Sequence, residues 1–123
     1  MSNNTVFSNE VGYLLCITDG SADDAEEYIS WGLDLITKVQ EVGHSRLLLD
    51  NRTFSLNLSP LDIVLFANKY EEMDVSQLGL RMAVLSNPKN PEVSRLIETT
   101  LTNRSAAYKR FETQADAIGW LLG

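Results

Sequence analysis

The most constraining feature of this sequence is an alternation, repeated four times, between a short apolar run and a longer segment with helical character. The apolar runs lie at residues 11–18, 46–50, 80–85 and 108–111. Each run has the length of a buried strand and is followed by residues that start a helix. Because strands joined through right-handed helical crossovers become parallel neighbours, this order predicts a mainly parallel sheet with helices packed against it. The predicted fold class is a single α/β domain over residues 1–123.

The predicted helices have clear starts and inward faces. The first follows Ser21-Ala22-Asp23-Asp24 and ends at Gly43, and its apolar side chains cover an arc of about 200°, wider than one sheet face needs. Ser59 and Asp62 flank a first-turn proline and cap the second helix. The inward stripe of that helix is predicted as Ile63, Phe66, Ala67, Tyr70 and Met73. The third helix is predicted to carry Val93, Leu96, Ile97 and Leu101 inward, and the last Ala117, Ile118 and Leu121.

The N-terminal segment is expected to add one more strand. Thr5-Val6-Phe7 precedes the first apolar run and is predicted to pair with it as a short antiparallel strand, while residues 1–4 are expected to be disordered. No linker divides the chain, and no internal repeat is present.

The negative charge is concentrated in the first part of the chain. The formal net charge is −7; residues 1–50 hold nine acids and two bases, whereas residues 51–123 hold eight of each. An acidic chain lacks the basic footprint that nucleic acids and anionic membranes require, so nucleic acid is not an expected partner. No apolar run is long enough to cross a bilayer and the polar start is not a signal peptide. The expected location is the cytoplasm, without stable membrane insertion.

The order and spacing of several stretches resemble the SpoIIAA-like superfamily, which comprises STAS domains and bacterial anti-sigma-factor antagonists. The residues that carry the resemblance are Gly20, Leu47-Leu48-Leu49-Asp50 with Arg52, Arg81-Met82-Ala83-Val84, Arg110-Phe111 and Ala117-Ile118-Gly119-Trp120-Leu121. The likeness is to small stand-alone bacterial members, which share features with CRAL-TRIO lipid-transfer domains. It implies a four-unit strand–helix fold and a binding or regulatory role, without an established enzymatic activity.

Anti-sigma-factor antagonists carry a phosphorylated serine in an Asp-Ser-Ser-Gly stretch that opens the second helix. The corresponding segment here is Asn57-Leu58-Ser59-Pro60-Leu61, which keeps one serine and lacks the neighbouring acid, the second serine and the glycine. Ser59 has two interpretations: a phosphoacceptor at the positive end of a helix, or an N-cap. The cap needs only residues that are present, and is the interpretation we favour.

The carboxyl ends of the predicted strands form the candidate ligand site, because open parallel sheets bind ligands there. Asp50, Arg52, Ser86 and Lys89 are expected at this edge, where Arg52 would hold a carboxylate or phosphate. The alternative is that Asp50 accepts loop amides and that Arg52 neutralises it. Response-regulator receivers also use an aspartate at a strand end, but on their third strand, whereas Asp50 ends the second predicted run.

Patterns for metal binding and nucleophilic catalysis are incomplete. In a calcium loop counted from Asp19, Asp24 replaces the required glycine and Ser30 the required glutamate. His44, the single histidine, has no predicted partners, and Cys16, the single cysteine, lies inside an apolar run. We therefore expect no metal, no cofactor and no enzymatic activity.

Two functions remain open from the sequence. The first is an interaction or regulatory module that uses surplus apolar side chains on the first two helices, with Trp31, Leu33, Leu61 and Leu65 as its expected interface to a protein partner or a second copy in a homodimer. The second is a carrier or sensor of a small lipid-like or anionic-headed ligand, bound at the carboxyl edge of the sheet.

Overall fold

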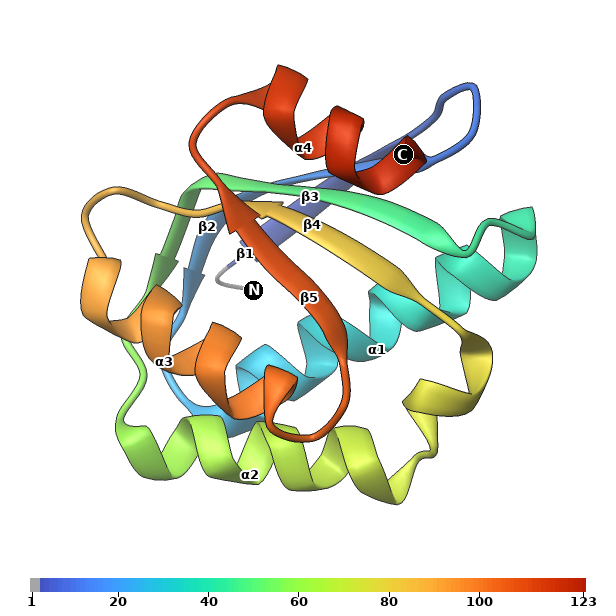
Figure 1. Ribbon diagram of the computed structural model, residues 1–123. Helices are drawn as coiled ribbons and strands as arrows, with labels where there is room; N and C mark the ends of the chain where they lie inside the picture. Colours follow the sequence, from blue (N-terminus) through green and yellow to red (C-terminus); the bar gives the residue numbers. More distant parts are fainter. Residues whose placement is uncertain (1–2) are drawn as a thin grey trace.

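The helices and strands of the computed structural model follow the predicted alternation, including the short N-terminal strand (Figure 1). The structure describes residues 3–123. Its strands are β1 (Asn3–Asn9), β2 (Leu14–Ala22), β3 (Arg46–Leu56), β4 (Arg81–Leu85) and β5 (Ala107–Phe111). Its helices are α1 (Ala25–Val42), α2 (Pro60–Glu72), α3 (Pro91–Thr102) and α4 (Gln114–Leu122), with a short 3-10 helix, η1 (Val75–Leu78), after α2.

The strands form one sheet in the order β1-β2-β3-β4-β5. β1 is antiparallel to β2, and the other neighbouring strands are parallel. Because each crossover advances by one strand in the same direction, right-handed connections place α1, α2 and α3 on one face of the sheet. α4 follows the last strand and returns over the opposite face (Figure 1). The predicted α/β fold class and the antiparallel N-terminal strand are confirmed.

Two apolar cores lie on the two faces of the sheet. The larger core, beneath α1, α2 and α3, contains an aromatic cluster in which Tyr28 stacks on Trp31, with ring centroids 5.1 Å apart. Phe54 and Phe66 pack against this pair at tilted angles, an arrangement that ring quadrupoles favour. The smaller core, beneath α4, joins Tyr13, Leu48, Ala83, Leu85, Ala117 and Leu121.

Trp31 is the buried end of a short hydrogen-bond chain. Its indole N–H donates to the Thr18 hydroxyl at 3.0 Å, and that hydroxyl lies 2.9 Å from the hydroxyl of Thr5. Trp31 is 5% exposed and Thr18 is fully buried. The surplus apolar surface predicted for α1 is therefore smaller than the helical pattern indicated, because the indole finds both a stacking partner and an acceptor inside the core.

The strands β2 and β3 extend beyond their predicted limits. β2 runs on to Ala22 through an irregularity between Ile17 and Asp19, and β3 runs on to Leu56. The two strands continue to pair with each other after β4 has ended. Asp50 was predicted to end its strand, but backbone pairing continues beyond it. The prediction failed because pairing between distant segments, rather than local polarity, decides where a strand stops.

The helix caps are as predicted, whereas two inward positions are not. Ser59 caps α2 in a capping box with Asp62, and Gly43 ends α1 with φ 78°. Leu96 was predicted to face the core but is 37% exposed, because α3 buries Ser94, Ile97 and Leu101 instead. Met73 is also exposed, since α2 ends at the preceding residue.

The N-terminus is more ordered than expected where the structure describes it. Asn3 and Asn4 belong to β1, and the side-chain amide of Asn3 donates to the carbonyl oxygen of Ser21. The remaining part of the predicted disordered segment, residues 1–2, lies outside the described residues. Within residues 3–123, no helix has the length and apolarity that a membrane span requires.

We expect the Thr18→Val substitution to lower the free energy of unfolding by about 1–3 kcal/mol, because the Trp31 N–H would remain buried without an acceptor. Thr5→Val is the control, since Thr18 still accepts from Trp31 in that variant. Urea denaturation of both variants measures the difference. Equal losses in the two variants would contradict a special role for the indole hydrogen bond.

Candidate functional site

An ion pair between Asp50 and Arg52 stands on the α4 side of β3. Asp50 follows Leu48 at two-residue spacing and therefore shares the sheet face that α4 partly covers. β3 has an extra residue between Asp50 and Thr53, so Arg52 is assigned to this face by its contact with Asp50 and not by its spacing. Arg52 donates to Asp50 through Nε at 2.9 Å and through Nη2 at 2.8 Å, in a bidentate arrangement. The hydrogen bonds from Arg52 lower the pKa of Asp50 and keep the carboxylate ionised.

A hollow of about 760 Å³ lies beside this ion pair, at the carboxyl ends of β4 and β5. The side chains around it include Arg52, Ser86, Arg110, Phe111, Glu112 and Asp116. Of the four residues predicted at this edge, Arg52 and Ser86 line the hollow. Asp50 does not line the hollow but forms the ion pair with Arg52. Lys89 does not line it either: it lies in the exposed loop before α3, where its backbone N–H donates to the side-chain oxygen of Asn87.

Arg110 is the functional candidate that the sequence analysis missed. Its backbone N–H donates to a carboxylate oxygen of Glu98 at 2.7 Å, and its Nε lies 3.3 Å from the other oxygen. Arg110 is the penultimate residue of β5. The rule that ligand sites lie at the carboxyl ends of parallel strands, which selected Arg52, therefore applies to Arg110 equally. The hollow thus has two guanidinium groups, each already paired with one carboxylate.

Asparagine side chains tie the loop after β4 to β3. The Asn87 amide donates to the Phe54 carbonyl oxygen at 3.2 Å, and Asn90 accepts from the Leu56 N–H at 3.1 Å. Both bonds reach the part of β3 that extends past β4. They fix the wall of the hollow, because each satisfies a backbone group that β4 no longer pairs with.

Ser59 is exposed and serves as a helix cap. Its hydroxyl accepts from the Asp62 N–H at 3.2 Å, while the Asp62 carboxylate accepts from the backbone N–H groups of Ser59 and Ala25. Asp62 therefore joins the first turns of α1 and α2, and the hydrogen bond from Ser59 lowers its pKa. A phosphate on Ser59 would lie beside this ionised carboxylate, which opposes the phosphoacceptor interpretation.

The acidic residues at the start of α1 act mainly as hydrogen-bond acceptors within the chain. Asp24 accepts from the Glu27 N–H at 2.9 Å, and Glu27 accepts from the Asp23 N–H at 2.8 Å. Asp23 also accepts from the side chain of Asn57. Among the described residues, no group of three His, Cys, Asp or Glu side chains is arranged to hold a metal ion.

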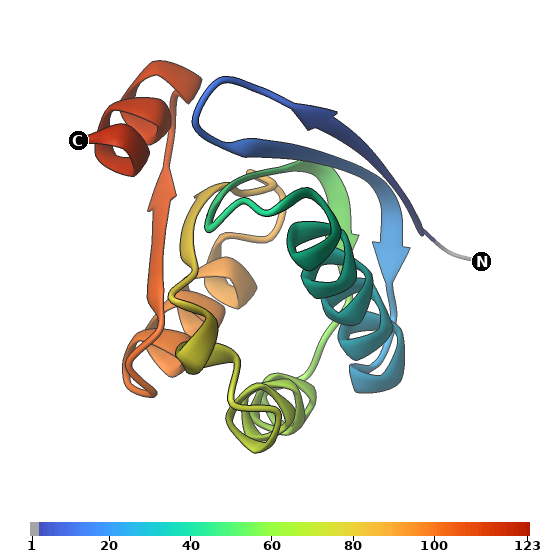
Figure 2. The same cartoon turned by 90° about the vertical axis from the view of Figure 1, so that its right-hand side faces the viewer.

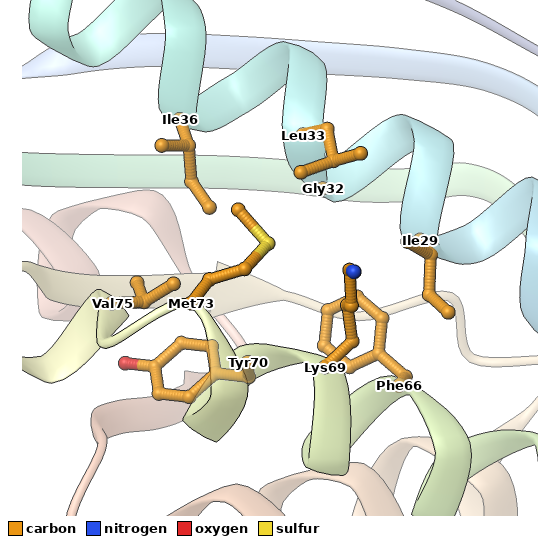
Figure 3. A pocket seen from close by; sticks show the side chains of 9 residues that line it. All are labelled: Ile29, Gly32, Leu33, Ile36, Phe66, Lys69, Tyr70, Met73 and Val75. Atoms are coloured by element: carbon orange, nitrogen blue, oxygen red, sulfur yellow. The ribbon is translucent and has the colours of Figure 1, made fainter.

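The side chains of α1 and α2 leave a shallow apolar groove between the two helices (Figure 3). The helices approach closely at Gly32, where a Cβ atom would lie 3.1 Å from the ring of Phe66. Figure 3 shows Met73 and Lys69 reaching from the α2 side toward α1. Beneath the groove, an apolar cavity of about 40 Å³ has room only for a few atoms. The groove is a surface feature rather than an entrance to a large ligand site.

Of the predicted interface residues, three are exposed. Leu61, Leu65 and Leu33 lie at the surface of α2 and α1, whereas Trp31 is buried and contributes to the core. Sequence periodicity separated Leu61 and Leu65 from the inward stripe correctly. The prediction that Trp31 belongs to the interface was wrong, because the apolar arc of α1 is wider than one sheet face needs. Helical periodicity also gives no information about Thr18, which accepts the hydrogen bond from the buried indole.

Cys16 and His44 lie away from the hollow. Burial raises the pKa of the Cys16 thiol to about 12, so it stays protonated and unreactive at neutral pH. His44 contacts the side chain of Asn9, near the opposite ends of the strands. Neither side chain contributes to a nucleophile–base pair.

Comparison with solved structures identifies the fold. The chain superposes on an anti-sigma factor antagonist from Mycobacterium paratuberculosis with a TM-score of 0.62, over 99% of this chain and 96% of the other, at 17% sequence identity. The predicted SpoIIAA-like (STAS) fold is thereby confirmed. No family model matches the sequence, and no curated protein matches it.

We expect Arg52→Gln to raise the pKa of Asp50 toward its ordinary value of 3.8, because the hydrogen bonds from Arg52 hold it lower. A carboxyl whose pKa is lowered by folding stabilises the folded state above its unfolded pKa, and this contribution disappears as the pH falls through the folded pKa. As the pH is lowered below 3.8, the free energy of unfolding should therefore fall less in the Arg52→Gln protein than in the parent. An NMR titration of the Asp50 carboxyl carbon measures the shift directly.

Lys89→Gln is the control for that titration, because Lys89 makes no ion pair with Asp50. An unchanged Asp50 titration in the Arg52→Gln protein would contradict the bidentate pair.

Proposed function

We propose that this chain is a non-enzymatic regulatory module of the cytoplasm that acts by binding another protein. The observation that carries the proposal is an exposed apolar surface on α1 and α2. The solved structure that shares the fold is named an anti-sigma factor antagonist, which supports a regulatory role.

The α1–α2 surface consists of Leu33, Leu61, Val64, Leu65 and Met73, all of them exposed. Leu61, Val64 and Leu65 are spaced three and four residues apart on α2, so they share one side of that helix. Leu61 alone is 65% exposed. Leu33 and Met73 line the groove beside this helix, and exposed apolar groups gathered on neighbouring helices are typical of protein-contact sites.

The charges around the α1–α2 surface define the chemistry of the partner. Lys69 lines the groove itself, and Asp62 lies in the first turn of α2. Further along the surface of α1, the exposed Glu26 and Asp34 line a separate hollow on the side of Asn3, so acidic side chains outnumber basic ones on these two helix faces. The complementary surface therefore combines apolar side chains with Lys or Arg. Because exposed charge pairs are screened, the contact should weaken as the salt concentration rises.

A pair of substitutions on α2 tests this proposal. The Leu61→Lys/Leu65→Lys protein should bind the partner at least about tenfold more weakly than the parent, since it loses two apolar anchors and repels basic groups. A partner is first captured from extracts of the native host, and its affinity is then measured by calorimetry at low and high salt. Leu96→Lys is the control, because Leu96 is also an exposed leucine (37%, against 45% for Leu65) but lies on α3.

Equal affinities for the double variant and the Leu96→Lys control would contradict the α1–α2 surface as the binding site. If the parent protein captures no partner from extracts of the native host, that result would contradict the proposal that the chain acts by binding another protein.

The hollow beside Arg52 favours a second candidate function, a carrier or sensor of a small ligand with an anionic head group. Its volume of about 760 Å³ falls in the range of ligand pockets. Arg52 and Arg110 supply two guanidinium groups, and Leu85 and Phe111 supply apolar walls. Glu112 and Asp116 at the same hollow restrict the head group to one that also offers a hydrogen-bond donor.

Native mass spectrometry of freshly purified protein tests the second candidate. A carrier should retain an added mass, and Arg52→Gln with Arg110→Gln should remove it because both guanidinium groups are lost. Arg95→Gln is the control, since Arg95 is exposed on α3 and does not line the hollow. A clean mass for the parent protein, or an added mass that survives in the double variant, would contradict the carrier.

A further inference from the structure

β1 forms one end of the sheet and has an open side. All seven residues from Asn3 to Asn9 pair with β2 in a regular register. On the other side of β1, no strand follows within residues 3–123 (Figure 2). α1 packs against β2, one strand in from this end, so it does not cover the outer side of β1. An edge of this kind is a template for pairing with another strand.

The two ends of the sheet differ in how they are protected. β5 carries Lys109 and Arg110, and the Glu98 carboxylate accepts the N–H of Arg110. β1 contains no charged residue, no proline and no bulge. Charge, proline and bulges are the devices that keep exposed edges from pairing, so only β5 is protected.

The hairpin determines which backbone groups of β1 face outward. The Glu10 N–H donates to the Tyr13 carbonyl oxygen at 3.0 Å. Hydrogen-bonded pairs alternate along an antiparallel ladder, so Ser8, Val6 and Asn4 exchange bonds with β2. The N–H and C=O groups of Asn3, Thr5, Phe7 and Asn9 then point away from β2, toward the open side.

We propose that the open side of β1 binds β1 of a second copy of this chain, antiparallel and centred on Val6. Two-fold symmetry then pairs Asn3 with Asn9, Thr5 with Phe7 and Val6 with itself, so the outward groups of both strands meet in about eight backbone hydrogen bonds. The resulting ten-stranded sheet would be continuous across the two copies.

The side chains of β1 suit this symmetric pairing. Val6 is 55% exposed and lies opposite Ile17, which is 36% exposed, on the sheet face that α4 leaves open. In the dimer, the two Val6 side chains become cross-strand neighbours and form one apolar strip with the two Ile17 side chains. At the ends of the strand, the Asn3 amide nitrogen already donates to Ser21 and the Asn9 amide oxygen contacts His44. The Asn3 oxygen and the Asn9 amide N–H groups are the atoms that can bond to each other across the two copies.

The occupant is inferred to be a second copy because the edge is self-complementary and uncharged. β1 itself has no charged side chain with which a charged peptide could pair, whereas an identical strand matches it in both polarity and hydrogen-bonding pattern. Each copy carries a net charge of −7, so the two copies repel each other as whole molecules. The dimer should therefore strengthen with salt, the opposite of the dependence expected for a basic partner on the α1–α2 surface.

The test is sedimentation equilibrium from about 10 μM to about 1 mM, the range expected for a small interface. The parent protein should dimerise, and Val6→Lys should raise the dissociation constant at least about tenfold, because two lysines would face each other across the symmetry axis. Leu61→Lys adds the same charge on α2 and should leave the dimer unchanged.

Amide exchange gives a second readout that does not depend on the variant. The Thr5 and Phe7 amide protons should exchange more slowly as the concentration of the parent protein rises, whereas those of Val6 and Ser8 are protected at all concentrations. A parent protein that stays monomeric over the whole range, or Thr5 and Phe7 amides with concentration-independent exchange, would overturn the β1 dimer. A dimer lost on Leu61→Lys but kept on Val6→Lys would assign self-association to the α1–α2 surface instead.

Discussion

The backbone pairing between β2 and β3 runs from Leu14 and Leu47 to Ala22 and Leu56, past the point where β4 ends. The rest of the structure depends on this long ladder, because side chains of β2 and β3 contribute to the apolar cores on both faces of the sheet. Thr18 on β2 accepts from Trp31, and Leu48 on β3 packs beneath α4. The extension of the ladder also leaves the edge of β3 open to the loop asparagines that shape the hollow.

The unequal covering of the two sheet faces accounts for where the candidate surfaces lie. Three helices cover one face of the sheet, and each of them also has an exposed leucine: Leu33 on α1, Leu61 and Leu65 on α2, and Leu96 on α3. A single helix covers the other face, over β3, β4 and β5 only. The part of that face that α4 leaves open includes the Asp50–Arg52 ion pair on β3 and Val6 on the edge strand β1. The sheet thus offers a polar hollow and an apolar edge at separate places, in addition to the helical surface.

The candidate sites were predictable where a local rule applies and not where distant segments meet. Ser59 and Asp62 form the capping box that their spacing predicts, and Leu61 is exposed as the periodicity of α2 requires. Arg110 was missed although it lies near the carboxyl end of a strand, since its position at the same hollow as Arg52 depends on the parallel register of β3, β4 and β5. Leu96 was misplaced because α3 packs through a narrow face centred on Ile97.

By itself, the sequence determined the order of the strands and helices, the caps that start and end them, and the mainly parallel sheet. These follow from apolar periodicity and from backbone groups that are satisfied within a few residues. Only the tertiary structure decided that Trp31 is core, that β3 extends beyond Asp50, and that the outer side of β1 is open. Each of these depends on which distant segment supplies a hydrogen bond or covers a side chain, and local sequence carries no record of that neighbour.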